Sequence, residues 1–360
     1  MKFLDLFAGI GGFRLGMESA GHECIGFCEI DKFARASYKA IHDTKGEIEL
    51  HDITRVTDES IRRIGCVDAI CGGFPCQAFS IAGNRRGFED IRGTLFFEIA
   101  RFASILRPQY LFLENVKGLL NHENGITFET IISTLDELGY DVEWQVLNSK
   151  DFGVPQNRER VFIIGHLRGE CTRRIFPLSG QSQSISNKSV VKIGNVNPSG
   201  NGMNGEVYQA DGLAPTLTTN KGEGQKIAIK SNTIKQFGVL QPNFNQCGVV
   251  YETDGIAPTI RAYQGGGLEP KIIQRGHGYN KGGVHEIAPT LTSNSYHENN
   301  HLSFGYRIRK LTPRECWRLQ GFPDWAFDKA QEVNSNSQLY KQAGNSVTVN
   351  VIAAIAKELE

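Results

Sequence analysis

Three short motifs carry side chains suited to covalent chemistry, and each adjoins a stretch typical of a β-strand. Cys76 stands in Gly-Gly-Phe-Pro-Cys-Gln, directly after the strand predicted over Val67–Cys71. Glu114 begins Glu-Asn-Val at the end of the next predicted strand, and Arg158 and Arg160 stand in Gln-Asn-Arg-Glu-Arg before another. Ligands of open α/β sheets bind at the carboxyl ends of the strands. A thiol, a carboxyl and two guanidinium groups should therefore meet at one edge, with Cys76 as a candidate nucleophile.

The convergence of these groups decides between this hypothesis and a structural interpretation. A lone cysteine is most often a small buried hydrophobe. Without the convergence, an ion pair of Glu114 with an arginine would likewise be purely structural. The buried interpretation is the one we apply to the other cysteines of the first half, which are Cys24, Cys28, Cys66 and Cys71.

A glycine-rich turn predicts a nucleotide-type cofactor site beside these motifs. Asp-Leu-Phe-Ala-Gly-Ile-Gly-Gly-Phe begins at Asp5 and joins the first predicted strand to a helix, and Glu29 ends the second strand. Glycines let the backbone approach a ligand, and an acid about 20 residues on accepts bonds from ribose hydroxyls. A dinucleotide fingerprint needs a third glycine where this chain has Arg14. The mismatch favours S-adenosylmethionine, which has no pyrophosphate. A tight structural turn is the alternative.

Strands and helices alternate over the first 165 residues. Helices are indicated after Thr94, with an apolar face from Leu95 to Leu106, and around Phe128–Leu138, ending at Gly139. This alternation predicts a doubly wound, Rossmann-like α/β domain with a parallel sheet covered on both faces. The strands are predicted over Phe3–Phe7, Cys24–Glu29, Val67–Cys71, Tyr110–Leu113, Val142–Leu147 and Val161–Ile164.

The middle of the chain has a different composition and predicts a smaller domain of short strands and loops. Formal charges sum to −6 over residues 1–165 and to +7 over 166–317, as a module facing a polyanion would show. Ala-Pro-Thr recurs at Pro215, Pro258 and Pro289, without a fixed period. After Tyr306 helices return, the first starting at Thr312-Pro-Arg-Glu, and an apolar-faced helix spans Val347–Leu359.

Composition excludes several classes of protein. With 40% hydrophobic and 22% charged residues and no net charge, the chain should be globular. Its apolar stretches are shorter than the ~20 residues of a spanning helix, and its first residues lack a secretory leader, so we expect a cytoplasmic protein. Eight cysteines without a Cys-x-x-Cys pair predict neither disulfides nor a metal site.

Taken together, the motifs resemble bacterial and phage DNA cytosine-C5 methyltransferases of the restriction–modification type. The matches follow the family's order over nearly the whole chain, while residues 170–305 match weakly, where the family places its target-recognition domain. The matching motifs are DLFAGIGG at 5–12, GFPCQAFS at 73–80, ENV at 114–116, QNRER at 156–160, LTPRECWRLQGFP at 311–323 and GNSV at 344–347.

The resemblance implies a mechanism. The thiolate of Cys76 adds to C6 of cytosine while Glu114 hydrogen-bonds or protonates N3, which makes C5 nucleophilic toward the sulfonium methyl group. A base then removes the C5 proton and the thiol is eliminated. Positive charge favours a thiolate; Arg160 is expected to supply it, and Arg158 to hold Glu114 or the base. Since these atoms are inaccessible in a stacked duplex, the cytosine must be flipped out.

The resemblance also implies the binding residues and the domain boundaries. Residues 1–188, completed by 344–360, should form the catalytic domain, 189–310 the target-recognition domain, and 311–343 a hinge. Position 30, often tryptophan in relatives, is isoleucine. S-adenosylmethionine should contact Phe7, Gly9, Ile10, Gly11, Gly12, Glu29, Ile30, Asp52, Ile53, Gly73, Pro75, Leu95, Asn345 and Val347. A loop over Ser80–Gly93 resembles the family's mobile active-site loop and should contact DNA through Ser80, Arg85, Arg86 and Arg92. Apart from the resemblance, the basic charge of the middle and its glycine-rich loop at 264–267 make Arg261, Tyr263 and Gln264 candidates for DNA contact.

The expected partner is double-stranded DNA, bound by a monomer that has no membrane association. A cognate restriction endonuclease would belong to the same system without direct contact. Alternatives are an RNA (tRNA) cytosine-C5 methyltransferase and a non-catalytic DNA-binding relative. The usual RNA type has a second cysteine where this chain has Glu-Asn-Val, which favours DNA. A Cys–His hydrolase is less favoured, because His22, His51 and His122 lie in no motif. The Ala-Pro-Thr segments are either scaffold or DNA-reading loops.

Overall fold

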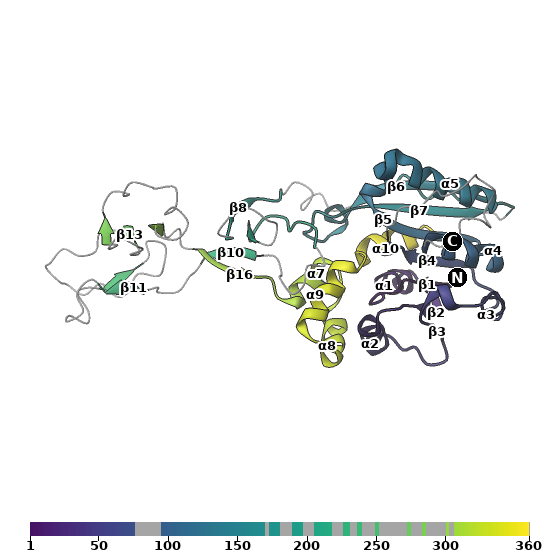
Figure 1. Ribbon diagram of the computed structural model, residues 1–360, viewed down its shortest axis with the longest axis horizontal. Coiled ribbons are helices and arrows are strands. Elements are labelled where there is room, and N and C mark those ends of the chain that lie inside the picture. The colour runs from purple at the N-terminus through teal and green to yellow at the C-terminus, as the bar shows by residue number, and fades with distance from the viewer. Residues whose placement is uncertain are drawn as a thin grey trace. The chain divides into compact units, whose positions relative to one another are not determined.

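The computed structural model (Figure 1) forms two compact units, which we describe separately. The first contains residues 1–191, 211–224 and 311–360, and the second contains 192–210 and 225–310. The structure describes residues 1–75, 95–169, 173–180, 189–196, 205–217, 226–230, 236–239, 249–251, 272–274, 283–285, 300–301 and 306–359.

A seven-stranded sheet in the order β3-β2-β1-β4-β5-β7-β6 is the centre of the first unit. Neighbours from β3 to β5 run parallel, whereas β7 is antiparallel to both β5 and β6. The predicted doubly wound α/β fold is confirmed. The strands are β1 (Lys2–Leu6), β2 (Glu23–Cys28), β3 (Ile48–Leu50), β4 (Ala69–Gly73), β5 (Tyr110–Val116), β6 (Tyr140–Asn148) and β7 (Glu159–Leu167).

Two features of this sheet differ from the prediction of parallel strands throughout. The connection between β6 and β7 is residues 149–158, too short for the crossover of a parallel pair, so the two strands form a hairpin. Strand β3 was not predicted, because its three residues Ile-Glu-Leu are too few to show a period.

Alternate residues of each strand face opposite layers of helices. In β5, Leu111 and Leu113 pack in a core cluster with α4 and α5, whereas Tyr110 and Phe112 pack in a second cluster with α1 and the C-terminal helix α10. Both faces are thus covered, as Figure 1 shows. The helices of the first half are α1 (Gly12–Ser19), α2 (Lys32–Ile41), α3 (Asp58–Arg62), α4 (Leu95–Leu106) and α5 (Ile126–Glu137), with 3-10 turns η1 (Ile53–Arg55), η3 (Lys117–Gly125) and η4 (Ser149–Phe152).

The C-terminal residues return to the first unit as four helices. They are α7 (Pro313–Leu319), α8 (Asp324–Val333), α9 (Asn336–Asn345) and α10 (Val349–Ala356). The predicted start at Thr312 is confirmed, since Thr312 and Glu315 form a capping box. Helix α10 packs closely on α1, where a Cβ atom at Gly16 would lie 2.5 Å from Ile352 Cγ2.

The second unit consists of short strands. One sheet has the order β16-β10-β9-β8, a two-stranded sheet joins β11 to β12, and a third has the order β14-β13-β15. Their bounds are β8 (Lys192–Asn195), β9 (Glu206–Gln209), β10 (Lys226–Lys230), β11 (Gln236–Val239), β12 (Val249–Tyr251), β13 (Ile272–Gln274), β14 (Gly283–His285), β15 (Asn300–His301) and β16 (Tyr306–Lys310).

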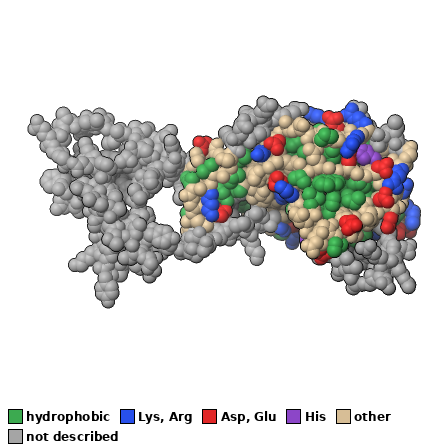
Figure 2. All heavy atoms as spheres, turned by 90° about the horizontal axis from the view of Figure 1, so that it is seen from above, with side chains coloured by type: hydrophobic (Ala, Val, Ile, Leu, Met, Phe, Trp, Pro, Cys, Tyr) green, Lys and Arg blue, Asp and Glu red, His purple; other side chains and the backbone are tan. Residues whose placement is uncertain are grey.

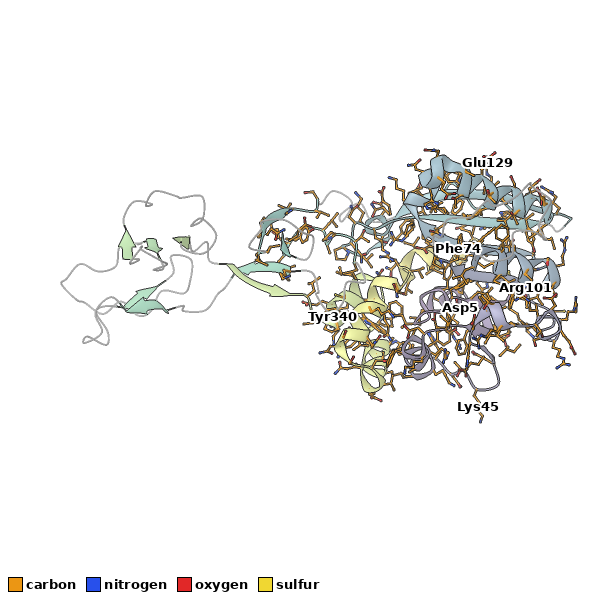
Figure 3. All side chains as sticks on the ribbon, in the orientation of Figure 1. Asp5, Lys45, Phe74, Arg101, Glu129 and Tyr340 are labelled. Atoms are coloured by element: carbon orange, nitrogen blue, oxygen red, sulfur yellow. The ribbon has the colours of Figure 1, made fainter. Side chains whose placement is uncertain are left out.

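The surface of the first unit mixes charge and hydrophobic side chains. On the face turned to the viewer in Figure 2, Lys and Arg side chains lie among Asp and Glu around a hydrophobic area. Within the described ranges, no helix is both long and apolar enough to span a bilayer. Figure 3 shows the side chains of this unit packed between its sheet and helices, with Asp5 and Phe74 in the interior.

Candidate active site

A cavity of about 650 Å³ opens at the carboxyl ends of β1, β2, β4 and β5. The motifs singled out in the sequence adjoin the strands that border this cavity. Of the residues expected to bind the cofactor, those that line the cavity are Phe7, Gly9, Ile10, Glu29, Ile30, Asp52, Ile53, Gly73, Pro75, Leu95 and Asn345. The other three lie beside it: a Cβ atom at Gly12 would be 2.8 Å from Val347 Cγ2, and Gly11 precedes Gly12 at the start of α1.

Backbone conformation in the glycine turn favours residues without a side chain at two positions. Gly9 and Gly11 have positive φ values of 56° and 84°, which L-residues with a Cβ adopt rarely. The turn closes through a hydrogen bond from Gly11 N to the Ala8 carbonyl (2.8 Å). Arg14, at the place of a third glycine, is buried and bonds the Glu47 carboxylate with both terminal nitrogens. It therefore connects α1 to the loop between α2 and β3 and is not among the residues that line the cavity.

Two backbone N–H groups hold the Glu29 carboxylate beside this turn. One of its carboxylate oxygens accepts a hydrogen bond from Gly9 N (2.8 Å) and the other from Asp31 N (2.7 Å). Burial raises the pKa of Glu29, and the two backbone N–H groups oppose that rise. Because each carboxylate oxygen accepts more than one bond, capacity for two ribose hydroxyls remains. Glu29 thus both shapes the turn and presents an acceptor to the cavity.

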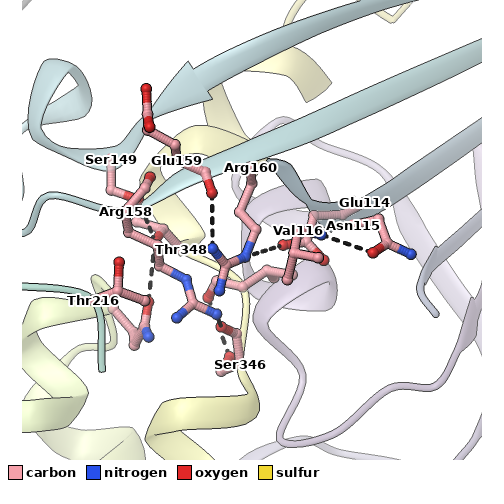
Figure 4. A network of polar contacts seen from close by, with 12 residues as sticks. Glu114, Asn115, Val116, Ser149, Arg158, Glu159, Arg160, Thr216, Ser346 and Thr348 are labelled. Atoms are coloured by element: carbon pink, nitrogen blue, oxygen red, sulfur yellow. Dashed lines mark hydrogen bonds and ion pairs between the residues drawn. The ribbon is translucent and has the colours of Figure 1, made fainter. Parts of the chain in front are cut away.

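Glu114 and Arg160 form the polar end of the cavity (Figure 4). Arg160 Nε lies 3.1 Å from Glu114 Oε1, and both side chains are largely buried. Burial raises the pKa of Glu114, while the charges of Arg160 and Arg158 oppose the rise. A Cβ atom at Gly73 would come within 3.1 Å of Glu114 Oε2, so the glycine leaves room for the carboxyl. A raised pKa favours the protonated carboxyl, which is the form that donates a proton or a hydrogen bond.

Among the described residues, Arg158 bonds backbone carbonyls and not Glu114, which was one of the two partners expected for it. Its guanidinium donates to the carbonyls of Ser346 (2.8 Å), Gly344 (3.3 Å) and Leu217 (3.4 Å). Burial, with the neighbouring charge of Arg160, lowers the pKa of Arg158 to about 9. Arg160 is therefore the ion-pair partner of Glu114, whereas Arg158 connects β7's N-terminal side to the backbone at 217 and 344–346 through hydrogen bonds.

The first Ala-Pro-Thr segment borders this cavity. Ala214 N donates to the Pro155 carbonyl and Asn157 N donates to the Ala214 carbonyl, both at 2.8 Å. Thr216 Oγ1 donates to the Asn157 carbonyl (2.8 Å), and Thr216 and Leu217 line the cavity. This copy therefore packs in the first unit, although it lies within the span 189–310 expected to recognise DNA. The other two copies lie outside the described residues.

Sequence reasoning missed Asn115, a buried amide beside Glu114. Its Nδ2 donates to the Phe74 carbonyl (2.9 Å), and its Oδ1 accepts from Val116 N (2.8 Å). Its place in the Glu-Asn-Val motif is the sequence feature that could have identified it. Cys66 was also misassigned: it is exposed after α3, whereas Cys24, Cys28 and Cys71 are buried as predicted.

Several predicted site residues lie outside the described residues. These are Cys76, Ser80, Arg85, Arg86, Arg92, Arg261, Tyr263 and Gln264. Among the residues that are described, no cluster of His, Cys, Asp and Glu side chains is suited to a metal ion.

Comparison with known sequences identifies one family. The model of the C-5 cytosine-specific DNA methylase family matches residues 1–360. Orphan methyltransferase M.SPRI of Bacillus phage SPR is 35% identical, covering 100% of this chain and 97% of that protein. Type II methyltransferase M.HhaI of Haemophilus parahaemolyticus is 36% identical, covering 99% and 93%.

Solved structures share the fold. Spodoptera frugiperda DNMT2 matches with a TM-score of 0.58 at 21% identity, covering 99% of this chain and 98% of that chain. The S. pombe Dnmt2 methyltransferase matches with a TM-score of 0.58 at 19% identity, covering 98% and 96%. At these identities the likeness concerns the fold alone.

Proposed function

Because this chain belongs to the C-5 cytosine-specific DNA methylase family, we propose that its cavity brings S-adenosylmethionine and a flipped-out cytosine of duplex DNA together. The enzyme methylates cytosine in DNA. The observation that carries the finer proposal is that one cavity has the glycine turn with Glu29 and the buried Glu114–Arg160 pair among its lining residues. We assign the first to the methyl donor and the second to the base.

The chemistry of the donor end fits S-adenosylmethionine. The turn at Gly9 and Gly11 exposes backbone where a Cβ would be strained, and Glu29 presents acceptors for ribose hydroxyls. Asp52 and Ile53 lie in the same lining and are proposed to contact the adenine. When bound, S-adenosylmethionine supplies an electrophilic sulfonium methyl group.

Residues of the chain prepare the cytosine for that group. Cytosine C5 becomes nucleophilic when the Cys76 thiolate adds to C6 and Glu114 hydrogen-bonds or protonates N3. Arg160 holds the Glu114 carboxyl at 3.1 Å and supplies positive charge to this end of the cavity. Arg158 contributes indirectly, by fixing the backbone at 217 and at 344–346. After C5 has received the methyl group, a base removes the C5 proton and Cys76 leaves as the thiolate, which restores the C5–C6 double bond.

The remaining roles extend this proposal. The second unit reads the DNA sequence, with Arg261, Tyr263 and Gln264 contacting bases, and Ser80, Arg85, Arg86 and Arg92 contact the backbone. The enzyme acts as a monomer in the cytoplasm, where it protects DNA against a cognate restriction endonuclease without binding it.

The decisive experiment compares two cysteine variants on two substrates. Wild-type enzyme should transfer a tritiated methyl group from S-adenosylmethionine to duplex DNA and not to tRNA, and should form a covalent adduct with DNA containing 5-fluorocytosine. Cys76→Ser should bind S-adenosylmethionine and lose nearly all transfer and all adduct, since a hydroxyl is far less acidic than a thiol. Cys66→Ser is the matched control, because Cys66 is exposed and away from the cavity lining. Transfer to tRNA, or an adduct that maps to another cysteine, would overturn the proposal.

A further inference from the structure

His42 lies directly against the glycine turn. It follows α2, is 7% exposed, and its Nε2 donates to the Ile10 carbonyl at 3.4 Å. A Cβ atom at Gly11 would collide with His42 Nε2. The imidazole therefore fills the space that a side chain in the turn would need, and it bonds the carbonyl at the centre of the turn.

Neighbouring aromatic rings fix the imidazole in this place. The centroid of the Tyr38 ring lies 4.6 Å from that of His42, and Tyr38 stacks on Phe27 with centroids 4.2 Å apart. Phe27 belongs to β2 and Tyr38 to α2, and both are fully buried. The position of His42 is thus set by the sheet and by α2, independently of the turn that it contacts.

The environment also fixes the charge state of the ring. Burial lowers the pKa of His42 to about 3, and the guanidinium of Arg14 on α1 and the ammonium of Lys329 on α8 act in the same direction. A neutral imidazole has one N–H. Since the Ile10 carbonyl only accepts, the hydrogen in this contact belongs to Nε2. No protonation change is needed for the role described next.

We propose that His42 is a positioning residue of the cofactor site, which holds the Ile10–Gly11 backbone in the conformation that receives the methyl donor. The inference rests on the proposed function in one respect, the assignment of the turn to S-adenosylmethionine. Ile10 lines the cavity and Gly11 is the N-cap of α1, so a displacement of this carbonyl would alter the donor end of the cavity. The part of the cavity lined by Glu114 would be left as it is.

The test compares two buried histidines of the same chain. His42→Ala should raise the Kd for S-adenosylmethionine about tenfold or more, with duplex DNA affinity unchanged. His42→Gln, which keeps a side-chain N–H donor, should recover part of the loss. His166→Ala is the matched control: His166 is buried, its ring packs against Tyr110 (centroids 5.5 Å apart), and its Nε2 bonds Glu143 (2.9 Å) outside the cavity lining. It should lower Tm without changing the Kd.

A measurement without cofactor separates this inference from the proposed function. In the cofactor-free protein, His42→Ala should speed hydrogen exchange at the Gly11 amide, which bonds the Ala8 carbonyl, and His166→Ala should not. If His42→Ala leaves both this exchange and the Kd at wild-type values, or if both histidine variants change them equally, His42 is an ordinary core residue. If the wild-type protein does not bind S-adenosylmethionine while the exchange effect is present, the donor assignment fails and the positioning role stands.

Discussion

The buried side-chain amide of Asn115 connects two backbone segments of the candidate active site. It ties the Phe74 carbonyl, two residues before Cys76, to the strand that carries Glu114. The amide thereby fixes the backbone that precedes Cys76, the proposed nucleophile, relative to Glu114, the proposed acid.

Asn115→Asp should therefore lower kcat by about 100-fold, because it removes the N–H donor and a misplacement of about 1 Å has this effect on rate. The Kd for S-adenosylmethionine should change less than about twofold, since no donor contact is assigned to this residue. Single-turnover methyl transfer and the rate of 5-fluorocytosine adduct formation would measure the effect. Asn350→Asp is the control, because Asn350 Nδ2 makes the same kind of bond to the Phe152 carbonyl (2.9 Å) away from the cavity lining. An equal loss of kcat in both variants would contradict a positioning role for Asn115.

Burial of the Asp5 carboxyl leads us to expect that the free energy of unfolding depends on pH. It lies in β1, and its Oδ2 accepts from Tyr38 Oη at 3.3 Å, while Oδ1 has no partner among the described residues. Burial raises its pKa from 3.8 to about 8, against the opposing charge of Arg14. The native state therefore holds a proton that the unfolded chain releases at lower pH, so this residue's contribution to the free energy of unfolding should fall as pH rises from about 4 to about 8.

Asp5→Asn should remove this slope, because an amide does not titrate. Urea unfolding of both proteins at pH 5 and pH 8 would show it: the gain in stability of the variant relative to wild type should be greater at pH 8. A difference that stays constant between the two pH values would mean that Asp5 is ionised in the native state.

Sequence alone identified which residue types gather at the site, but not how each side chain is directed. Glu114, Arg158 and Arg160 were expected together, yet Arg160 and not Arg158 contacts the carboxyl. The choice depends on rotamers and on the carbonyls at 344–346, which come from a distant part of the chain. His42 was not singled out because its role requires knowing that its ring lies against Gly11.

At the scale of elements, α1 and α10 pack against each other in the core cluster that covers one face of the main sheet. Gly16 on α1 lies against Ile352 on α10. Alanine is favoured over glycine by ~1 kcal/mol in a helix interior. The added methyl, however, would lie 2.5 Å from Ile352 Cγ2 and 2.9 Å from Ala353 N, where backbone cannot yield cheaply.

We expect Gly16→Ala to destabilise the protein by about 1–3 kcal/mol, as overpacking does, in spite of its better helix propensity. The free energy of unfolding in urea would measure this. Adding Ile352→Ala should recover part of the loss if the clash is the cause. A stabilised Gly16→Ala protein would show that α10 shifts freely.

Element positions were predictable where a periodic pattern was long. The helix at Leu95–Leu106 and the start of α7 at Thr312 were placed correctly from apolar spacing and capping residues. The three-residue strand β3 and the antiparallel direction of β7 were not, because the first has no pattern and the second depends on pairing across the sheet.

At the scale of the whole molecule, the chain places its cavity in one unit and most of its basic middle in the other. All residues that line the cavity belong to the first unit, including Thr216 and Leu217. Charge and glycine content indicate a change near residue 166 and the resemblance implies one near 189, while the first compact segment ends at Val191. The return of 211–217 to the first unit was not visible in composition, because it rests on backbone bonds at Pro155 and Asn157.

Substitutions in 225–310 should therefore change sequence choice without changing donor binding. Alanine at Arg261, Tyr263 or Gln264 should each relax discrimination at some position of the target by ~1–3 kcal/mol, while Lys226→Ala should mainly alter salt dependence. Methylome sequencing would report target choice, and calorimetry the Kd for S-adenosylmethionine. Unaltered target choice in all three variants would place base reading elsewhere in 170–305.

The chain order of the cavity walls has a consequence for synthesis. All seven strands of the main sheet are complete at Leu167, but the wall at 341–346 and the covering helix α10 are made only after the entire second unit. A growing chain thus contains all residues of the sheet before it contains those that complete the cavity. We infer that the growing polypeptide is unable to retain its methyl donor until α9 has emerged, so that partly made chains do not modify DNA.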